Sequence, residues 1–290
     1  MTGIRGEVRF DAPLRELTSF RIGGPADALV VPADLEDLVR LVQQARATKT
    51  RIFVMGGTNL LIRDSGIRGI VVSLSKLNAI KDEPDGVVYA EAGVRMPTLI
   101  RHAIRLGLGG LEWAAGIPGT VAGCVVMNAG TRLGEMKDAL KAVRLVDPSG
   151  RVRTCPASAI RFSYRRALLP RGVLAGVWLQ LRPAAREKIE AAVKDYLRYR
   201  KHTQPLTLPN AGCVFKNPSH DSAGRLIEAV GLKGARVGDA QVSTQHANFV
   251  VNLGRARAAD VIALIKKVGR AVEEQTGKTL ELELKIVGQP

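Results

Sequence analysis

The first residues with chemical potential form a glycine loop after a short apolar run. Met55-Gly56-Gly57-Thr58-Asn59-Leu60-Leu61 follows the strand expected at residues 51–55. Consecutive glycines let backbone N–H groups surround a phosphate, and Thr58 and Asn59 add side-chain donors. The loop has neither the Gly-Lys-Ser/Thr of a Walker A loop nor the GxGxxG spacing of a dinucleotide fingerprint. Taken alone, it favours an ordinary tight turn over a phosphate site.

Two further loops of small residues follow. Gly116-Ile117-Pro118-Gly119-Thr120-Val121-Ala122-Gly123 has glycine at three positions, so side chains are missing there and something flat or bulky can approach. Asn128-Ala129-Gly130 is the third loop. Close packing between elements would explain either loop alone. Three such loops between residues 55 and 130 favour a large cofactor that carries a diphosphate, bound in a manner unlike the Rossmann fold.

The charge of the chain indicates an anionic partner. The 290 residues carry 43 Lys and Arg against 27 Asp and Glu, a formal net charge of +16. Between Lys141 and Lys201, fifteen basic residues stand against four acidic ones, a local excess of 11. A nucleic-acid footprint, a site for phosphorylated small molecules and a solvated basic surface all fit this pattern. Aromatic residues make up only 4%, which argues against a stacking surface for single-stranded nucleic acid.

Cysteine usage and hydropathy bear on the compartment. The three cysteines, Cys124, Cys155 and Cys213, are odd in number and form no CxxC pair. Neither a disulfide framework nor a zinc site is therefore indicated, and we expect no metal site. The N-terminus lacks a signal-peptide pattern, and no apolar run approaches the roughly 18 residues of a membrane span. We expect a cytoplasmic protein without a membrane segment.

Strands and helices alternate in the first half of the chain. Asp34 is the expected N-cap of a helix, because apolar residues then repeat at helical spacing up to Val42. Pro97 can open a second helix that runs to about Gly107. The stretch from Gly107 to Gly130 is so rich in glycine that we expect packed loops. Strands are expected at residues 28–31, 51–55, 70–74 and 87–90.

The second half shows the same mixture. A strand pair joined by a turn is expected at 140–146 and 151–155, then a strand at 173–181 and a helix at 186–200. Two prolines in residues 203–209 indicate a domain boundary. Beyond it we expect strands at 211–215 and 248–252, a helix at 225–230, and a long helix stopped by Gly277. Residues 280–287 alternate as a half-exposed strand, which would place Glu281 and Glu283 on one face.

An ordered set of motifs resembles one enzyme family. Each motif is modest alone, but their order along residues 18–288 is highly specific. The chain resembles the UDP-N-acetylenolpyruvoylglucosamine reductases (UDP-N-acetylmuramate dehydrogenases, the MurB family). The motifs are the first two glycine loops, Asn128-Ala129-Gly130, Thr18-Ser19-Phe20-Arg21-Ile22-Gly23-Gly24-Pro25-Ala26, Phe162-Ser163-Tyr164-Arg165, Asn210-Ala211-Gly212-Cys213-Val214-Phe215-Lys216-Asn217-Pro218 and Glu283-Leu284-Lys285-Ile286-Val287-Gly288.

The resemblance implies an α+β architecture. It comprises an FAD-binding fold of the vanillyl-alcohol-oxidase class in two subdomains, followed by a C-terminal α/β substrate-binding domain. We expect the first subdomain at residues 1–75, the second at 76–200 and the substrate domain at 201–290. The short spacing from Arg165 to Cys213 is similar to that of the shorter subfamily, which lacks an extra substrate-covering loop. We expect a monomer.

The resemblance also implies a reaction, a step of peptidoglycan precursor synthesis. NADPH reduces FAD, and reduced FAD passes hydride to the enolpyruvyl methylene carbon of a UDP-sugar. Arg165 matches the arginine that stabilises the developing negative charge, and Glu283 matches the glutamate that polarises the enolpyruvyl group. Cys213 departs from the family, in which serine commonly donates the proton. A thiol is more acidic than an alcohol and can donate as well, although a buried core cysteine is the alternative.

Binding residues are carried over in the same way. Lys285 is a second departure, because the family commonly has arginine near the flavin and lysine lacks its fork geometry. The substrate contacts implied are Tyr164, Lys216, Asn217 and Asn248. The FAD, bound non-covalently, is expected to contact Met55, Gly56, Gly57, Thr58, Asn59, Leu60, Gly116, Ile117, Pro118, Gly119, Thr120, Gly123, Asn128, Ala129, Gly130 and Lys285.

Two rival interpretations remain open. A different oxidoreductase on the same FAD fold, such as a hydroxy-acid or alcohol oxidase, would turn over in air without NADPH. A basic nucleic-acid-binding protein would be colourless and would bind DNA in a salt-dependent way. The resemblance favours a UDP-sugar and NADPH as the small-molecule partners, with no nucleic acid and no membrane.

Overall fold

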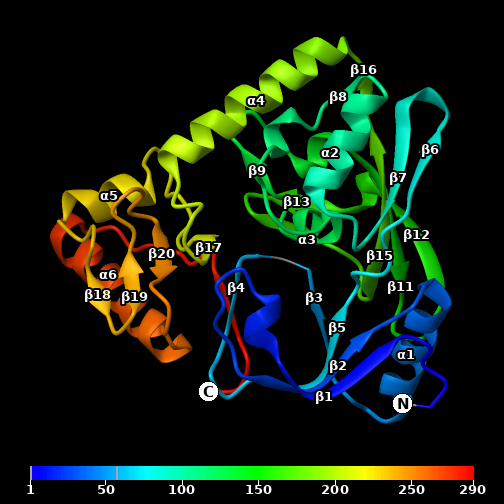
Figure 1. Cartoon of the computed structure of the whole chain (residues 1–290), viewed down its shortest axis with the longest axis horizontal. Coiled ribbons are helices and arrows are strands. Elements are labelled where there is room, and N and C mark those ends of the chain that lie inside the picture. The colour runs from blue at the N-terminus through cyan, green and yellow to red at the C-terminus, as the bar shows by residue number, and fades with distance from the viewer. Residues whose placement is uncertain (1, 57) are drawn as a thin grey trace. The chain divides into compact units, whose positions relative to one another are not determined.

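The computed structural model describes residues 2–56 and 58–290, so the predicted cofactor residue Gly57 lies outside the described residues. The chain forms two compact units (Figure 1). Unit 1 comprises residues 2–10, 28–56 and 69–199, and unit 2 comprises residues 11–27, 58–68 and 200–290. The C-terminal part therefore shares a unit with two earlier segments, whose residues Phe20, Ile22 and Leu61 join its core. The three-part domain division stays a prediction.

A four-stranded sheet carries the first helix. Its order is β1 (Glu7–Pro13), β2 (Pro25–Val31), β5 (Ile67–Ser73) and β3 (Ile52–Met55), and β3 and β5 are parallel. Asp34 caps α1 (Leu35–Ala47) as expected, accepting from the Asp37 N–H at 2.9 Å. The unit boundary falls within β1, β2 and β5, so these strands pass from one unit into the other.

A five-stranded antiparallel sheet is the centre of unit 1. Its strand order is β12 (Val152–Pro156), β11 (Leu140–Val146), β15 (Val173–Gln180), β7 (Val87–Glu91) and β6 (Ile80–Glu83). The predicted strand pair at 140–155 is confirmed as β11 and β12. The helix expected from Pro97 is α2 (Met96–Arg105), which has its proline in the first turn.

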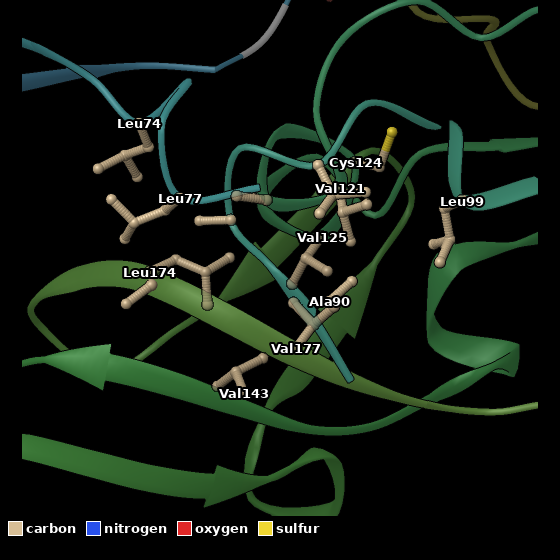
Figure 2. Packing of buried hydrophobic residues seen from close by; sticks show 14 of the residues in the cluster. Leu74, Leu77, Ala90, Leu99, Val121, Cys124, Val125, Val143, Leu174 and Val177 are labelled. Atoms are coloured by element: carbon tan, nitrogen blue, oxygen red, sulfur yellow. The ribbon is translucent and has the colours of Figure 1, made fainter. Parts of the chain in front are cut away.

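The glycine-rich stretch contains a short α-helix, although packed loops were predicted there. Residues Val121–Val126 form the short helix α3, capped by Thr120. Val121 and Val125 lie in one buried cluster with Ala90 and Val177 of the sheet (Figure 2). The helix contains one glycine, Gly123, and burial of its valines outweighs the poor helix propensity of this sequence.

Short ribbons and most of one long helix, whose last residues belong to unit 2, complete unit 1. Two- and three-residue strands show no periodicity, and the sequence analysis did not predict them. The helix expected at 186–200 is α4 (Arg186–Thr203). The ribbons pair β8 (Leu108–Gly109) with β16 (Arg182–Pro183), β9 (Gly130–Thr131) with β10 (Gly134–Glu135), and β13 (Arg161–Ser163) with β14 (Arg166–Leu168).

Unit 2 is built on a second antiparallel sheet. Its order is β17 (Asn210–Cys213), β20 (Phe249–Asn252), β19 (Ala240–Val242) and β18 (Arg236–Val237). The helices α5 (Ala223–Ala229) and α6 (Ala258–Thr276) share a core with this sheet, and Figure 1 shows α6 beside β18 and β19. Gly277 ends α6 at φ 68°, which confirms the predicted stop.

The last strand is shorter than expected. Only β21 (Lys285–Val287) is regular, and it pairs in parallel with β4 (Leu60–Ile62). Before it, the N–H groups of Glu283 and Leu284 both donate to the Val214 carbonyl, at 2.9 and 3.1 Å. Two consecutive donors on one acceptor break the alternation of a strand. The prediction of a continuous strand over residues 280–287 was therefore wrong, and the period-two argument for Glu281 and Glu283 does not apply. Across residues 2–56 and 58–290, no helix is both long and apolar enough to cross a membrane.

Candidate active site

Thr120 joins the first two glycine loops in unit 1. Its N–H and its Oγ1 both donate to the Gly56 carbonyl, at 3.2 and 3.0 Å, and Oγ1 accepts from the Gly123 N–H at 3.2 Å. A Cβ on residue 56 would lie 3.1 Å from this hydroxyl, so glycine allows the close approach. The loop after β3 and the start of α3 are therefore one local structure.

The loop before α3 fits a large, flat ligand. Gly116 and Gly119 have φ angles of 74° and 101°, a region that favours glycine. Ile117 and Gly119 are half-buried, Pro118 is exposed, and the loop bears no charged side chain. Such a surface exposes backbone to a ligand without placing a carboxylate against a diphosphate. The residues present therefore fit the FAD expected from the sequence.

The third loop directs its polar side chain into the protein. Asn128, at φ 41°, is buried; its Nδ2 donates to Glu135 Oε2 at 2.6 Å and to the Ser163 carbonyl at 3.3 Å. Its Oδ1 accepts from the Lys137 N–H at 3.1 Å. Contact of Asn128, Ala129 and Gly130 with the cofactor stays a prediction. For Asn128, only the backbone would make this contact, because the side chain is bonded to the protein. The side chain instead connects this loop to the β13–β14 hairpin.

Arg165 lies beside the third loop. Tyr164 and Arg165 form the two-residue turn of the β13–β14 hairpin, and Arg165 has a left-handed φ of 59°. Its Nη1 donates to the Gly130 carbonyl at 2.7 Å, and its guanidinium lies 5.1 Å from the centroid of the Tyr164 ring. Tyr164 is 49% exposed. Unit 1 therefore places the predicted catalytic arginine against a predicted cofactor loop.

Cys213 ends β17 in unit 2, at an irregularity of the sheet. The pairing of β17 with β20 shifts register between Asn210 and Cys213, and Gly212 has a φ of 77°. A bulge of this kind redirects the following side chain. The Cys213 side chain is half-buried, whereas Cys124 in unit 1 is fully buried and burial raises its pKa to about 12. Cys124 is thus a packing residue.

Glu283 is tied to the residue that follows Cys213. The Val214 carbonyl accepts from the Glu283 N–H, and the Lys216 N–H donates to the Glu281 carbonyl at 2.8 Å. Phe215 and Leu282 form a bridge between these two bonds. The segment that carries Cys213 and the segment that carries Glu283 consequently run side by side, and Glu283 is half-buried.

Residues 58–61, the second part of the first glycine loop, lie beside the segment that carries Glu283. The Lys285 N–H donates to the Asn59 carbonyl at 2.9 Å, and Asn59 Nδ2 donates to the Glu283 carbonyl at 3.3 Å. Leu60 pairs with Lys285 in the β4–β21 ladder, and its side chain is buried. Ser19 Oγ donates to the Thr58 carbonyl at 3.0 Å, which explains part of the Thr18–Ala26 motif.

The remaining predicted substrate residues of unit 2 differ in exposure. Lys216 is part-buried and its Nζ lies 2.5 Å from Glu281 Oε1, while Asn217 is exposed and its Oδ1 accepts from the Ala223 N–H at 3.1 Å. Asn248 is 2% exposed and its amide is bonded to the backbone of Phe215. Neither the Glu281 partner of Lys216 nor the direction of the Asn248 side chain leaves a local pattern in the sequence, so neither was predicted.

His246 adds a titratable group near Asn248. Burial lowers the pKa of His246, and its Nδ1 accepts from the Asn248 N–H at 3.2 Å. The acceptor role requires an unprotonated Nδ1, which agrees with the lowered pKa. The ring also packs on Phe249, with centroids 4.9 Å apart.

Comparisons with known proteins give consistent matches to both parts. Residues 26–156 match the sequence profile of an FAD binding domain, and residues 204–287 match that of the UDP-N-acetylenolpyruvoylglucosamine reductase C-terminal domain. UDP-N-acetylenolpyruvoylglucosamine reductase 2 of Symbiobacterium thermophilum is 46% identical over 287 residues, covering 98% of this chain and 93% of the relative. The corresponding reductase of Syntrophus aciditrophicus is 44% identical over 292 residues, covering 99% and 94%.

A solved structure shows the same fold over the full length. The crystal structure of UDP-N-acetylenolpyruvylglucosamine reductase from Thermus caldophilus matches with a TM-score of 0.83 at 39% identity. The match covers 98% of this chain and 99% of that chain.

Proposed function

The chain belongs to the UDP-N-acetylenolpyruvoylglucosamine reductase family, and we propose that it uses NADPH to reduce UDP-N-acetylglucosamine enolpyruvate to UDP-N-acetylmuramate. It is an FAD-dependent oxidoreductase with the α+β FAD-binding fold expected from the resemblance. FAD, when bound, supplies the hydride chemistry between NADPH and the enolpyruvyl methylene carbon. The glycine loops joined by Thr120 are the residues that would hold it.

Arg165 stabilises negative charge in this proposal. Hydride addition to the methylene carbon leaves an enolate-like charge on the substrate, next to its carboxylate. A guanidinium can donate two parallel hydrogen bonds to such a group. The bond to Gly130 and the contact with the Tyr164 ring restrain the arginine, which would position the donor before substrate arrives.

Cys213 donates the proton that completes the reduction. One hydride and one proton must be added across the double bond, and the carbon next to the methylene takes the proton. The thiol of Cys213 is half-buried and follows a glycine in the left-handed region, so a ligand can approach its backbone closely. A thiol is more acidic than an alcohol and can act as a general acid.

Glu283 assists the same step. Its carboxyl group would polarise the enolpyruvyl group or orient it against the proton donor. The observation that carries the proposed function is the hydrogen bond from the Glu283 N–H to the Val214 carbonyl, at 2.9 Å. Val214 directly follows Cys213, so this bond brings the segments of Cys213 and Glu283 together. This arrangement supports a donor and a polarising acid that act on one substrate group.

The basic surface has a use in this function. The substrate carries a diphosphate and a carboxylate, and NADPH carries further phosphates. The local excess of 11 positive charges between Lys141 and Lys201 would attract both ligands. Nucleic acid is not needed to explain the charge.

The decisive experiment separates reductase from oxidase. The purified protein should show a flavin absorbance, and acid precipitation should release that colour into the supernatant, as expected for non-covalent FAD. Under anaerobic conditions, NADPH should bleach the flavin, and UDP-N-acetylglucosamine enolpyruvate should restore it, giving a product heavier by two hydrogens in mass spectrometry. Restoration by oxygen alone, with no turnover of the UDP-sugar, would instead support an oxidase on the same fold.

A further inference from the structure

The carboxamide of Asn248 makes two hydrogen bonds to the backbone of one residue, Phe215. Its Nδ2 donates to the Phe215 carbonyl at 2.8 Å, and its Oδ1 accepts from the Phe215 N–H at 3.0 Å. Its main-chain carbonyl accepts from the Val214 N–H at 2.9 Å. With 2% of the residue exposed, these bonds are shielded from water. Asn248 therefore fixes the two residues that directly follow Cys213.

The same two residues hold the Glu283 segment. Val214 offers its carbonyl to Glu283 and Leu284, and Phe215 pairs with Leu282. A shift of Val214 and Phe215 would therefore move Cys213, which precedes them in the chain. It would also move Glu283, which is hydrogen-bonded to Val214. The carboxamide of Asn248 is the side chain that opposes such a shift.

The backbone pairing of β17 with β20 continues to Val214 but does not reach Phe215. Strand β17 ends at Cys213, after the register shift that follows Asn210. At Phe215, the side chain of Asn248 supplies the donor and the acceptor that a neighbouring strand would otherwise supply. Only a carboxamide of this length provides both, because aspartate lacks the donor and leucine lacks both groups.

We propose that Asn248 is a positioning residue that sets Cys213 relative to Glu283, rather than a contact of the substrate. The catalytic consequence rests on the proposed function, but the structural consequence does not. Loss of the carboxamide should loosen the segment that carries the Cys213 thiol, and this can be measured without any substrate.

Asn252 provides a matched control on the same strand. It is also 2% exposed, and its carboxamide is also bonded to backbone. Its Nδ2 donates to the Phe20 carbonyl at 3.1 Å, and its Oδ1 accepts from Gly254 and Ala256 at 2.8 and 3.0 Å. Asn248→Ala and Asn252→Ala thus remove equivalent groups and should lower the melting temperature to a similar extent.

The first measurement is thiol alkylation of the FAD-loaded protein by iodoacetamide, followed residue by residue by peptide mass spectrometry. Cys155, in unit 1, is half-exposed and serves as the internal reference. Since local opening governs reaction at a half-buried site, losing two hydrogen bonds should speed alkylation of Cys213 about tenfold in Asn248→Ala. Asn252→Ala should stay within about twofold of the unaltered protein. An unchanged Cys213 rate in Asn248→Ala, or equal acceleration in both variants, would overturn the proposal.

The second measurement separates positioning from substrate contact. Asn248→Ala should be reduced by NADPH at the normal rate, whereas reoxidation by saturating UDP-N-acetylglucosamine enolpyruvate should slow about 100-fold. A raised KM with full reoxidation at saturation would identify Asn248 as a substrate contact and reject positioning. If every form of the protein lacks reductase activity, the proposed function fails while the alkylation result still decides the structural claim. Asn248→Ser, which is uncharged and keeps a short polar side chain, gives both readouts if the alanine variant does not fold.

Discussion

Arg165 occupies a backbone conformation that few side chains favour. Its φ of 59° costs roughly 1 kcal/mol or more for a residue with a Cβ, and glycine or asparagine would avoid much of that cost. Retention of arginine at the tip of the hairpin is explained if the guanidinium is needed at that point. The tip presents it beside Gly130, at the edge of the predicted cofactor site.

Substitution of Arg165 by lysine tests this need directly. Arg165→Lys keeps the charge and the same backbone strain, but it removes the bidentate fork. We expect kcat to fall about 100-fold or more, because charge stabilisation in the transition state is lost, while the Kd of FAD changes by less than about threefold. Steady-state kinetics and flavin titration measure the two quantities. Arg166→Lys, on the next residue of the same hairpin, should leave both near normal; an equal loss in FAD affinity would make Arg165 a cofactor clamp.

Cys213 can be tested by separating the two half-reactions. Cys213→Ser should retain turnover, because the site needs a short side chain with an exchangeable proton. Cys213→Ala should still be reduced by NADPH, but reoxidation by the enolpyruvyl substrate should slow by about 100- to 10,000-fold. Rapid mixing of the pre-reduced variant with substrate, followed at the flavin absorbance, measures this step. Normal reoxidation and product formation in Cys213→Ala would return the residue to a packing role.

At the scale of elements, Thr120 connects the cap of α3 to a predicted cofactor loop. Thr120→Ala removes the acceptor for Gly123 and the hydroxyl bond to Gly56, and should lower the free energy of unfolding by about 1 kcal/mol. Because the first glycine loop is then less restrained, the Kd of FAD should rise about five- to tenfold. Flavin fluorescence titration and denaturant unfolding measure the two effects.

Ser222 is the control for that prediction. It caps α5 in unit 2 through its Oγ, which accepts from the Arg225 N–H at 3.3 Å. Ser222→Ala should show a comparable loss of stability without a change in FAD affinity. If both cap variants weaken FAD binding equally, general stability rather than loop geometry would account for the effect.

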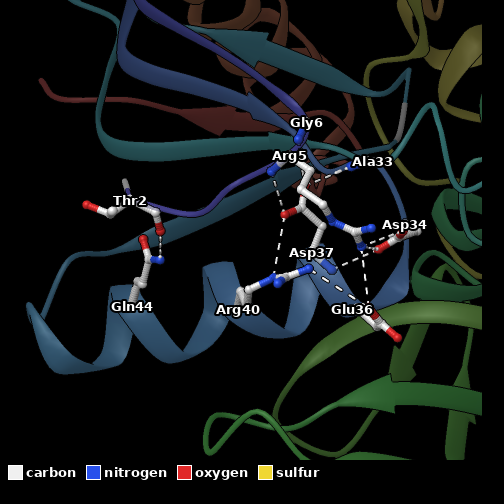
Figure 3. A network of polar contacts seen from close by, with 9 residues as sticks. All are labelled: Thr2, Arg5, Gly6, Ala33, Asp34, Glu36, Asp37, Arg40 and Gln44. Atoms are coloured by element: carbon white, nitrogen blue, oxygen red, sulfur yellow. Dashed lines mark hydrogen bonds and ion pairs between the residues drawn. The ribbon is translucent and has the colours of Figure 1, made fainter.

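The start of α1 contains a buried carboxylate that should respond to acid. Asp37 is 0% exposed and accepts from the N–H groups of Arg5, Gly6 and Ala33 at 2.9, 2.8 and 2.9 Å (Figure 3). Burial alone would raise the pKa of Asp37, but these three donors and the charge of Arg5 hold it below the usual value. The carboxylate thereby fastens the N-terminal segment to the helix.

The direction of the pH effect follows from that lowered pKa. An unfolded aspartate has a pKa of about 3.9, so the stabilisation is complete above roughly pH 5 and is lost as the pH falls through the lower folded value. Asp37→Asn should cost about 3 kcal/mol at pH 7, since an amide group then faces backbone donors, and should flatten the acid dependence of unfolding. Asp34→Asn, at the half-exposed cap of the same helix, should cost less than about 0.5 kcal/mol. Urea unfolding from pH 3 to 7 measures both; an unaltered acid slope in Asp37→Asn would contradict the assignment.

Whether an element could be predicted depended on its length and on whether its hydrogen-bond partners are local or remote in the sequence. Helices α1 and α6 were predicted because an apolar stripe and a terminal cap, Asp34 or Gly277, lie within one stretch of sequence. The ribbons β9–β10 and β13–β14 were not predicted, because strands of two or three residues have no period to detect. The strand expected at 280–287 was wrong because the Val214 carbonyl, remote in sequence, takes two consecutive N–H groups.

The site residues also divide into features set by the local sequence, which could be predicted, and features set by remote partners, which could not. Motif order indicated which residue types matter, and the structure brings Thr120 to Gly56, Arg165 to Gly130, and Glu283 to Val214. The directions of side chains were not predictable, because they depend on tertiary partners. Asn248 and Asn128 stand in motifs that suggest ligand contact, yet both turn their carboxamides to the protein.

At the scale of the whole molecule, the net charge of +16 favours encounter with anionic ligands. Most of the local excess lies in unit 1, and it already allows for the acidic residues Asp147 and Glu190, which pair with Arg153 and Arg186. Uncompensated exposed charges act over about 10 Å in 0.1 M salt and raise the encounter rate of anionic ligands. They contribute little to the bound complex once the ligand is seated.

Salt should therefore affect encounter more than chemistry. Raising NaCl from 50 to 500 mM should lower kcat/KM for the UDP-sugar about tenfold and leave kcat within about twofold. Replacing exposed arginines near the Arg165 hairpin should reproduce part of this loss at low salt and reduce the salt dependence. The triple variant is Arg161→Gln, Arg166→Gln and Arg171→Gln.

A second triple variant distinguishes local attraction from total charge. Lys76→Gln, Lys81→Gln and Arg101→Gln remove the same number of exposed charges from other parts of unit 1. If the charges near the hairpin steer the ligands, this control should retain most of its kcat/KM and most of its salt dependence. Equal losses in the two triple variants would mean that net charge alone sets the encounter rate. A kcat/KM that does not change with salt in the unaltered protein would leave the basic surface as solvated polar surface, because a charge that attracts no ligand can still keep the protein dispersed.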